Sequence, residues 1–197
     1  MLLGRRMGVL PAALTFVTGV HGKPRLADEW RCPLSFSTSH SRGLILFAVA
    51  RGLSVGVDVE YIRSDFEPAA FAERFLATDE LEALRALPAA RRTAAFFACW
   101  TRKEAVIKAR GGALLNAVGE ISVSVAPECE PRLIAWRGRG ECTLQWSLGD
   151  VPTPGFSASA AAPVPNVAFH HHGELNPCCL LEPDTGRLSH GCAGCIR

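Results

Sequence analysis

The 197 residues contain 21 Lys and Arg against 19 Asp and Glu, a formal net charge of +2, and 48% of them are hydrophobic. This length and apolar content suffice to bury one substantial core or two small related ones. The balanced charge gives no support to a nucleic-acid-binding class of protein, which needs a basic surface to neutralise phosphates. A few local cations would still suffice to hold a small polyanionic ligand.

The first apolar stretch, residues 7–20, follows two arginines and loosely imitates a secretory signal. No small-x-small cleavage site follows it, Pro11 interrupts it, and it is too short to span a membrane. We therefore expect a strand over 14–19, entering a turn at 22–24, and no membrane association.

Alternating apolar residues and glycine punctuation then predict three strands. A strand over 35–39 runs into a polar turn over 40–43, and the apolar run 44–50 is typical of a buried strand. The segment 55–62 is expected to return as its hairpin partner.

Two helices are expected next. Thr78 suits an N-cap, because acidic residues follow it in the first turn, and Pro88 would end that helix. The segment 91–110 has no internal Gly or Pro and stops at Gly111, which predicts a longer helix. Short strand candidates follow, so the whole pattern indicates a mixed α+β fold; these candidates are 121–125, 132–136, 142–148 and 156–162.

The eight cysteines fall into two groups. Those far apart in apolar segments are expected to be buried reduced thiols: Cys32, Cys99, Cys129 and Cys142. The segment 164–197 holds the others together with four histidines, all potential zinc ligands. It has a single C-x-x-C and otherwise no familiar zinc spacing, so we expect an unstructured extension; its Cys and His residues are His170, His171, His172, Cys178, Cys179, His190, Cys192 and Cys195.

Asp58 and Glu60 are two apart in a strand, so their carboxylates share a face with Cα atoms about 6.6 Å apart. Such a pair repels unless a cation lies between, and Mg²⁺ favours this kind of oxygen ligand together with substrate phosphates. Gly56, on the same face, would let a ligand approach closely. The alternative is a solvated strand face.

Trp100, Glu104 and Lys108 are four apart and form one stripe of the longer helix. A functional interpretation makes Glu104 a third carboxylate for the metal or a base, and Lys108 a cation that faces phosphate oxygens. The alternative is an ordinary surface Glu–Lys pair, worth a few tenths of a kcal/mol.

Taken together, GVDVE (56–60) and WTRKEAVIK (100–108) resemble the paired signature of the 4′-phosphopantetheinyl transferase superfamily. The D-x-E form resembles the surfactin-type (Sfp-like) branch, which is monomeric and built as a pseudo-dimer of two similar α/β halves. The positions that match the signature are Gly56, Asp58, Trp100, Thr101, Lys103, Glu104, Ala105 and Lys108.

Further matches to the family follow in order over roughly residues 9–163. HGKPRL (21–26) is similar to a segment whose lysine contacts coenzyme A, and FSTSHS (36–41) to one whose serine and histidine hold its 3′-phosphate. RFLATDE (74–80) and PGFSASAAA (154–162) also resemble family segments.

The resemblance implies a Mg²⁺-dependent enzyme that moves 4′-phosphopantetheine from coenzyme A to a serine of an acyl or peptidyl carrier protein, releasing 3′,5′-ADP. Asp58, Glu60 and Glu104 would bind Mg²⁺. Glu104 would also be the base, and Lys108 would offset charge on the phosphoryl oxygens. Lys23, Ser39, His40 and Lys108 would bind coenzyme A. Lys103 lies off the stripe and is expected to be supportive or phosphate-directed.

Surfactin-type members have a longer N-terminal half than this chain offers. The resemblance therefore implies a shortened first half over 1–54, a second half with the metal site over 55–163, and the tail 164–197. A catalytically weak or inactive coenzyme A-binding relative is the alternative function. The family also implies a cytoplasmic monomer and a carrier-docking region near 66–87.

Overall fold

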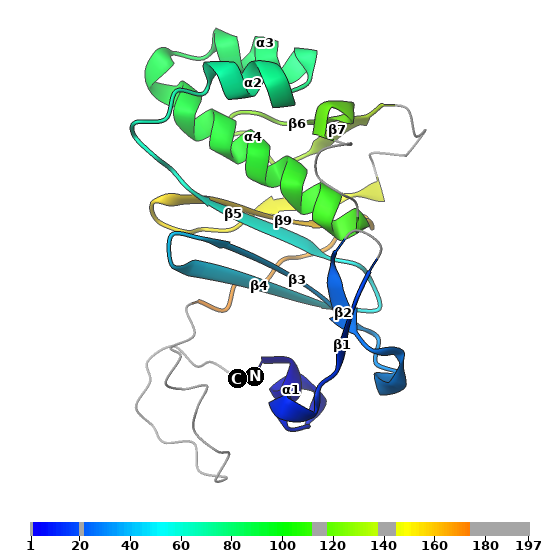
Figure 1. Ribbon diagram of the computed structural model, residues 1–197. Coiled ribbons are helices and arrows are strands. Elements are labelled where there is room, and N and C mark those ends of the chain that lie inside the picture. The colour runs from blue at the N-terminus through cyan, green and yellow to red at the C-terminus, as the bar shows by residue number, and fades with distance from the viewer. Residues whose placement is uncertain (1, 20–21, 112–117, 138–144, 174–197) are drawn as a thin grey trace. The chain divides into compact units, whose positions relative to one another are not determined.

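The computed structural model describes residues 2–19, 22–111, 118–137 and 145–173 (Figure 1). The chain divides into two compact units, one made of 1–15 and 170–197 and the other of 16–169. In the first unit the structure describes helix α1 (Leu2–Met7) and a 3-10 turn, Pro11–Ala13. Among the described helices, none is long and apolar enough to cross a membrane. The expectations for Cys142 and for the tail beyond 173 lie outside the described residues.

The second unit confirms a mixed α+β architecture. Within the described residues its strands form four antiparallel groups, and its α-helices lie in the chain between the strand Gly56–Tyr61 and the strand Ile121–Val123. The groups are β1 (Phe16–Thr18) with β2 (Pro24–Leu26), β3 (Leu34–Ser41) with β4 (Leu44–Arg51), β6 (Ile121–Val123) with β7 (Leu133–Trp136), and the three-stranded sheet β5 (Gly56–Tyr61), β9 (Phe156–Ala162), β8 (Ser147–Asp150).

The expected hairpin between 44–50 and 55–62 is wrong. Strand β4 pairs with β3 along its whole length through a two-residue turn, in which Arg42 and Gly43 both have positive φ, as a tight hairpin requires. Strand β3 therefore runs through His40 and Ser41, which the sequence pattern had placed in the turn. Strand β5 pairs with β9 instead.

Strand β4 is also not buried as expected. Its residues are half-buried or exposed, and Ile45 is 70% exposed. The reason is its position, because it is the outer strand of a two-stranded sheet.

Three helices follow β5: α2 (Ala69–Phe75), α3 (Thr78–Ala86) and α4 (Ala89–Arg110). Ala77, not Thr78, is the N-cap of α3, because the Glu80 carboxylate accepts a hydrogen bond from the Ala77 amide at 2.8 Å. The long helix is confirmed within two residues, and it ends at Gly111 in the left-handed region.

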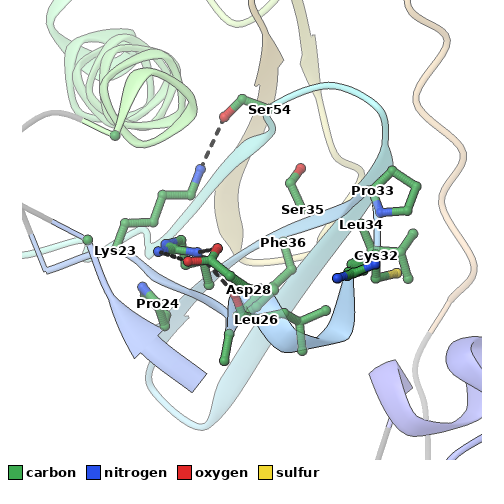
Figure 2. A pocket seen from close by; sticks show the side chains of 15 residues that line it. Lys23, Pro24, Leu26, Asp28, Cys32, Pro33, Leu34, Ser35, Phe36 and Ser54 are labelled. Carbon is green, nitrogen blue, oxygen red and sulfur yellow. Dashed lines mark hydrogen bonds and ion pairs between the residues drawn. The ribbon is translucent and has the colours of Figure 1, made fainter. Parts of the chain in front are cut away.

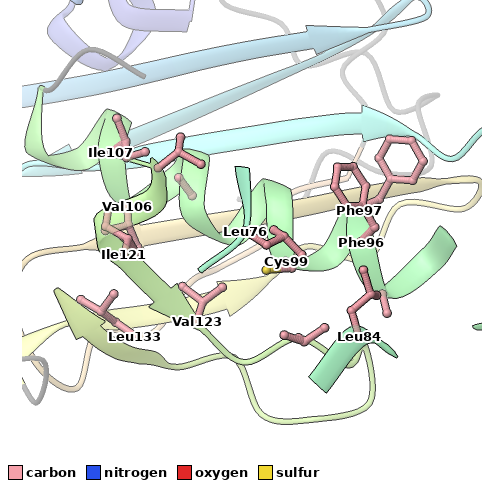
Figure 3. Packing of buried hydrophobic residues seen from close by; sticks show 14 of the residues in the cluster. Leu76, Leu84, Phe96, Phe97, Cys99, Val106, Ile107, Ile121, Val123 and Leu133 are labelled. Carbon is pink, nitrogen blue, oxygen red and sulfur yellow. The ribbon is translucent and has the colours of Figure 1, made fainter. Parts of the chain in front are cut away.

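The main core lies where one side of α4 meets α3 and the β6–β7 pair (Figure 3). Burial of these side chains fixes α4, since each large apolar side chain removed from water contributes about 1.5–3 kcal/mol. Cys99 is buried here as expected, whereas Cys32 is half-buried and Cys129 is exposed, against expectation. The labelled core residues are Leu76, Leu84, Phe96, Phe97, Cys99, Val106, Ile107, Ile121, Val123 and Leu133.

On its other side, α4 packs against β5 and β9 at very short range. A Cβ built on Gly56 would lie 3.0 Å from the carbonyl carbon of Ala105, and closer still to the Ala105 oxygen and the Ala109 amide nitrogen. Gly56 therefore makes room for the backbone of α4, not for a ligand as the sequence suggested. This close approach brings the helix carboxylate beside the strand carboxylates.

Candidate functional site

A cavity of about 390 Å³ lies where β3, β5 and α4 meet. The odd-even alternation of β5 aims Asp58 and Glu60 into it, and the 3.6-residue period of α4 brings Trp100, Glu104 and Lys108 along one stripe. Three carboxylates and one ammonium group therefore share one small cavity, and these are residues that the family resemblance implied for the site. Its lining residues are Thr38, Ser39, His40, Asp58, Glu60, Trp100, Glu104 and Lys108.

Asp58 lies at the bottom of this site, with its side chain 5% exposed. Its Oδ1 accepts hydrogen bonds from Lys108 Nζ at 2.6 Å and from Ser39 Oγ at 2.7 Å. Burial raises the pKa of this carboxyl, and the nearby Lys108 ammonium opposes the rise. The second oxygen, Oδ2, is buried and has no hydrogen-bond partner among the described residues.

Glu104 is also buried, and its Oε1 likewise has no hydrogen-bond partner in the described part of the chain. Burial, followed by repulsion from Asp58, raises the pKa of Glu104 to about 7, while Lys108 acts against the shift. A carboxyl with this pKa exchanges its proton near neutral pH, which suits a general base.

Glu60 sits at the more open side of the cavity. Ser41 Oγ donates a hydrogen bond to its Oε2 at 3.2 Å. Burial, and then the charge of Asp58, raise the pKa of Glu60. All three carboxyls are thus harder to ionise than in water, which is the expected result of crowding acids beside one ammonium group.

These donors suit a small divalent cation. Two buried carboxylate oxygens without partners, Asp58 Oδ2 and Glu104 Oε1, cost free energy unless a cation or a polar ligand joins them. Oxygen-only donors suit hard cations, and Mg²⁺ is the one that typically binds one or two carboxylates together with substrate phosphates. No three His, Cys, Asp or Glu side chains within the described ranges stand close enough to form a ready-made metal centre. These residues fit a cation that binds together with a second ligand, which would supply the coordination that the protein does not.

Lys23 lies outside this cavity. Its Nζ donates to the main-chain oxygens of Val55 and Lys108, both at 2.8 Å, and to Ser54 Oγ at 3.4 Å (Figure 2). Burial lowers the pKa of Lys23. It borders a second cavity of about 650 Å³ that also includes Arg25 and Cys32. Lys23 therefore ties the end of α4 to the start of β5, and its predicted contact with coenzyme A stays a prediction.

Lys103 does not point to the cavity. It is fully buried and pairs with Glu80, and its Nζ also donates to the Phe75 oxygen at 3.3 Å. Glu80 Oε1 accepts from the Val123 amide at 2.8 Å. The pair joins α4, α3 and β6, so the phosphate-directed role suggested for Lys103 has no support in this geometry.

Some residues at the site were not singled out from sequence. Thr38 lines the cavity, and Ser41 contacts Glu60. The available signal was the alternation of Ser37, Ser39 and Ser41, which continues the strand two residues beyond its predicted end.

Comparison with known proteins agrees with this geometry. The family model of the 4′-phosphopantetheinyl transferase superfamily matches residues 54–161, which contain Asp58, Glu60, Glu104 and Lys108. The 4′-phosphopantetheinyl transferase HetI of Nostoc sp. is 37% identical over 127 residues, 64% of this chain and 53% of that protein. The 4′-phosphopantetheinyl transferase AcpT of Salmonella typhi is 35% identical over 118 residues, 60% of this chain and 59% of that protein. The chain spans about half the length of the curated relatives it matches.

Among solved structures, a holo-(acyl-carrier-protein) synthase from Bacillus anthracis in complex with CoA (3′,5′-ADP) covers 58% of this chain and 97% of its own. Its sequence identity is 21% and its TM-score is 0.45.

Proposed function

Since the chain belongs to the 4′-phosphopantetheinyl transferase superfamily, we propose that it transfers 4′-phosphopantetheine from coenzyme A to a serine of an acyl or peptidyl carrier protein. The observation that carries this proposal is the meeting of Asp58, Glu60, Glu104 and Lys108 in one cavity. The names of the relatives, HetI and AcpT, support the same reaction.

In this reaction the serine oxygen of the carrier attacks the phosphorus that bears the pantetheine arm. A new P–O bond forms, and the P–O bond to the departing 3′,5′-ADP breaks. The serine proton must leave, and negative charge grows on the leaving group. A site for this chemistry therefore needs a base and a concentration of positive charge.

Glu104 is the base in this proposal. With a pKa of about 7, it can take the serine proton near neutral pH without being too weak a base. Its Oε1 has no hydrogen-bond partner among the described residues, so the carboxylate keeps lone pairs both for a cation and for that proton. Lys108, four residues further along α4, places its ammonium group in the same cavity.

Asp58, Glu60 and Glu104 would hold Mg²⁺. When bound, this ion neutralises the pyrophosphate oxygens and the growing charge on the leaving group. Lys108 balances the charge of Asp58 in the described structure, at 2.6 Å. A cation bound at Asp58 would make Lys108 available to phosphate oxygens.

Lys23, Ser39 and His40 are proposed to bind coenzyme A. His40 is exposed and borders the cavity, so its ring can reach a ligand there. Ser39 already donates to Asp58, so its contact with the ligand would involve the free lone pairs of its hydroxyl.

The finer assignments belong to the same proposal. They are the surfactin-type branch, a monomeric pseudo-dimer with one half over 1–54 and the other over 55–163, and a cytoplasmic location. Carrier docking is proposed near 66–87, where Phe71 is 49% exposed and packs on buried Phe66.

The test is incubation of the full chain with an apo acyl carrier protein or an apo peptidyl carrier protein, coenzyme A and Mg²⁺. Intact-mass spectrometry should show the carrier gain the mass of one phosphopantetheine. Asp58→Asn and Glu104→Gln should each slow transfer by roughly 10²- to 10⁴-fold. Glu130→Ala is the matched control, because it removes an exposed carboxylate that does not line the cavity.

An unmodified carrier, with coenzyme A still raising the melting temperature of the chain, would instead support the weak coenzyme A-binding relative. Full activity of Glu104→Gln would show that Glu104 is not the base.

A further inference from the structure

We propose that Ser41 is a positioning residue that holds the Glu60 carboxylate toward the acidic cavity, an inference that rests on the proposed function. The observation behind it is a row of serines along β3. Ser37, Ser39 and Ser41 alternate in sequence and therefore face the same way, toward β5. We call these three residues the serine seam.

The seam joins two strands that share no main-chain ladder. Strand β3 pairs with β4, and β5 pairs with β9, yet β3 and β5 lie in contact. The hydroxyls bridge this gap, because Ser37 Oγ accepts from the Val57 amide at 3.1 Å and Ser41 Oγ accepts from the Tyr61 amide at 3.0 Å. The two strands run in the same direction along the seam.

The direction of the Ser41 proton follows from this geometry. A hydroxyl has one proton to donate and can also accept. Its acceptor side takes the Tyr61 amide, so its proton points to Glu60 Oε2 at 3.2 Å. The main chain thus orients the hydroxyl, and the hydroxyl orients the carboxylate.

Glu60 needs such an anchor. Asp58 repels it from inside the cavity more strongly than either Lys108 or Arg63 attracts it. A carboxylate in this field turns toward solvent unless a donor holds it. Hydrogen-bonded partners of metal ligands fix ligand orientation in the same way, and their loss typically lowers metal affinity about 10- to 100-fold.

Ser37 provides a matched control within the same seam. It bonds the main chain of β5 as Ser41 does, but within the described residues its hydroxyl meets no carboxylate. Replacing either serine removes one bridge between β3 and β5. Replacing Ser41 additionally frees Glu60.

The experiment compares Ser41→Ala, Ser41→Thr and Ser37→Ala in the full chain. Calorimetric titration of Mg²⁺ in the presence of coenzyme A measures metal affinity, and thermal melts without either ligand measure the fold. We expect both alanine variants to melt earlier. Ser41→Ala should weaken Mg²⁺ binding about tenfold, whereas Ser37→Ala and Ser41→Thr should stay within about twofold of the parent chain.

Equal Mg²⁺ affinities for Ser41→Ala and Ser37→Ala would overturn the inference and leave Ser41 with a purely structural bridge. Failure of the parent chain to bind Mg²⁺ or to modify a carrier would overturn the proposed function instead, so the two failures are distinct. If Ser41→Ala does not fold, Ser41→Thr and Ser41→Val make the same comparison, because they share one shape and differ in the hydroxyl.

Discussion

Gly56→Ala tests the close approach of β5 and α4 on which the acidic cavity depends. The added methyl carbon would lie 3.0 Å from the Ala105 carbonyl carbon, and closer still to two other backbone atoms of α4. Real Cβ atoms essentially never come this close to a neighbour. No side-chain rotation relieves the clash, because the atoms that must move belong to the helix backbone.

The expected cost exceeds that of an ordinary core substitution. Adding one methylene to a packed core costs about 1–3 kcal/mol when side chains can adjust. Here α4 must shift as a whole, and its other side is held by the main core, so we expect a loss of about 3 kcal/mol or more. For a chain of this size that corresponds to a melting temperature lower by roughly 6–12 °C.

Urea unfolding followed by circular dichroism measures this loss, and the carrier-modification assay below the melting temperature measures its effect on the site. Gly119→Ala is the control, because a Cβ there meets no atom within 4 Å. We expect Gly56→Ala to lose transfer even where it is folded, since a shifted α4 moves Glu104 away from Asp58. A variant as stable as Gly119→Ala would refute the packing argument.

Two further predictions concern buried charges. The raised pKa of Glu104, about 7 against 4.5 for the free group, means that the folded state keeps a proton that the unfolded state has lost. The free energy of unfolding should therefore fall as pH rises from about 4.5 to 7. Across that window the free energy of unfolding of Glu104→Gln should rise by up to about 3 kcal/mol relative to the parent chain. Urea midpoints at pH 5 and 8 measure this difference, and a difference that does not change with pH would contradict the prediction. Lys103→Ala should destabilise the fold by about 3–5 kcal/mol, because it leaves Glu80 buried and unpaired. The control is Arg85→Ala, which removes an exposed ion pair and should cost less than about 1 kcal/mol. If Lys103→Ala instead keeps its fold and raises the KM for coenzyme A, Lys103 is a phosphate ligand.

Local periodicity predicted the long helix, the stripe of Glu104 and Lys108, and the shared face of Asp58 and Glu60, whereas the meeting of the strand acids with the helix acid was implied only by the family resemblance. Helix α4 has no internal Gly or Pro, and a four-residue spacing places Glu104 and Lys108 on one stripe whatever else surrounds them. In the same way a two-residue spacing places Asp58 and Glu60 on one face of β5.

Strand pairing could not be predicted from the same patterns. The apolar run of β4 was expected to be buried and to pair with β5, yet β4 pairs with β3 and leaves Ile45 exposed. The partner of β5 is β9, about a hundred residues away in the sequence, and local alternation carries no information about a partner at that distance. The extension of β3 through Ser41 was missed for a related reason, because serine is a common turn residue and the local pattern does not show where the turn begins.

The segment WTRKEAVIK contains residues that face the cavity and residues that stabilise the fold, and the sequence alone could not tell the two kinds apart. Glu104 and Lys108 face the cavity, whereas Thr101 turns to β9, where its hydroxyl meets Ser159 Oγ at 3.1 Å. Lys103 turns to α3, and its charge serves the fold. This division follows from the 100° step of a helix, because consecutive residues must face different neighbours.

The packing residues matter to the site as much as the acids do. Carboxylates on two separate elements converge only if those elements come closer than ordinary side chains allow, and Gly56 opposite Ala105 permits that approach. Strand β3 then has to be held beside β5 without a main-chain ladder, and the serine seam provides the bridge. Mutations at Gly56 or Ser41 should therefore impair the site although no acid is replaced, which separates the geometry of the cavity from its chemistry.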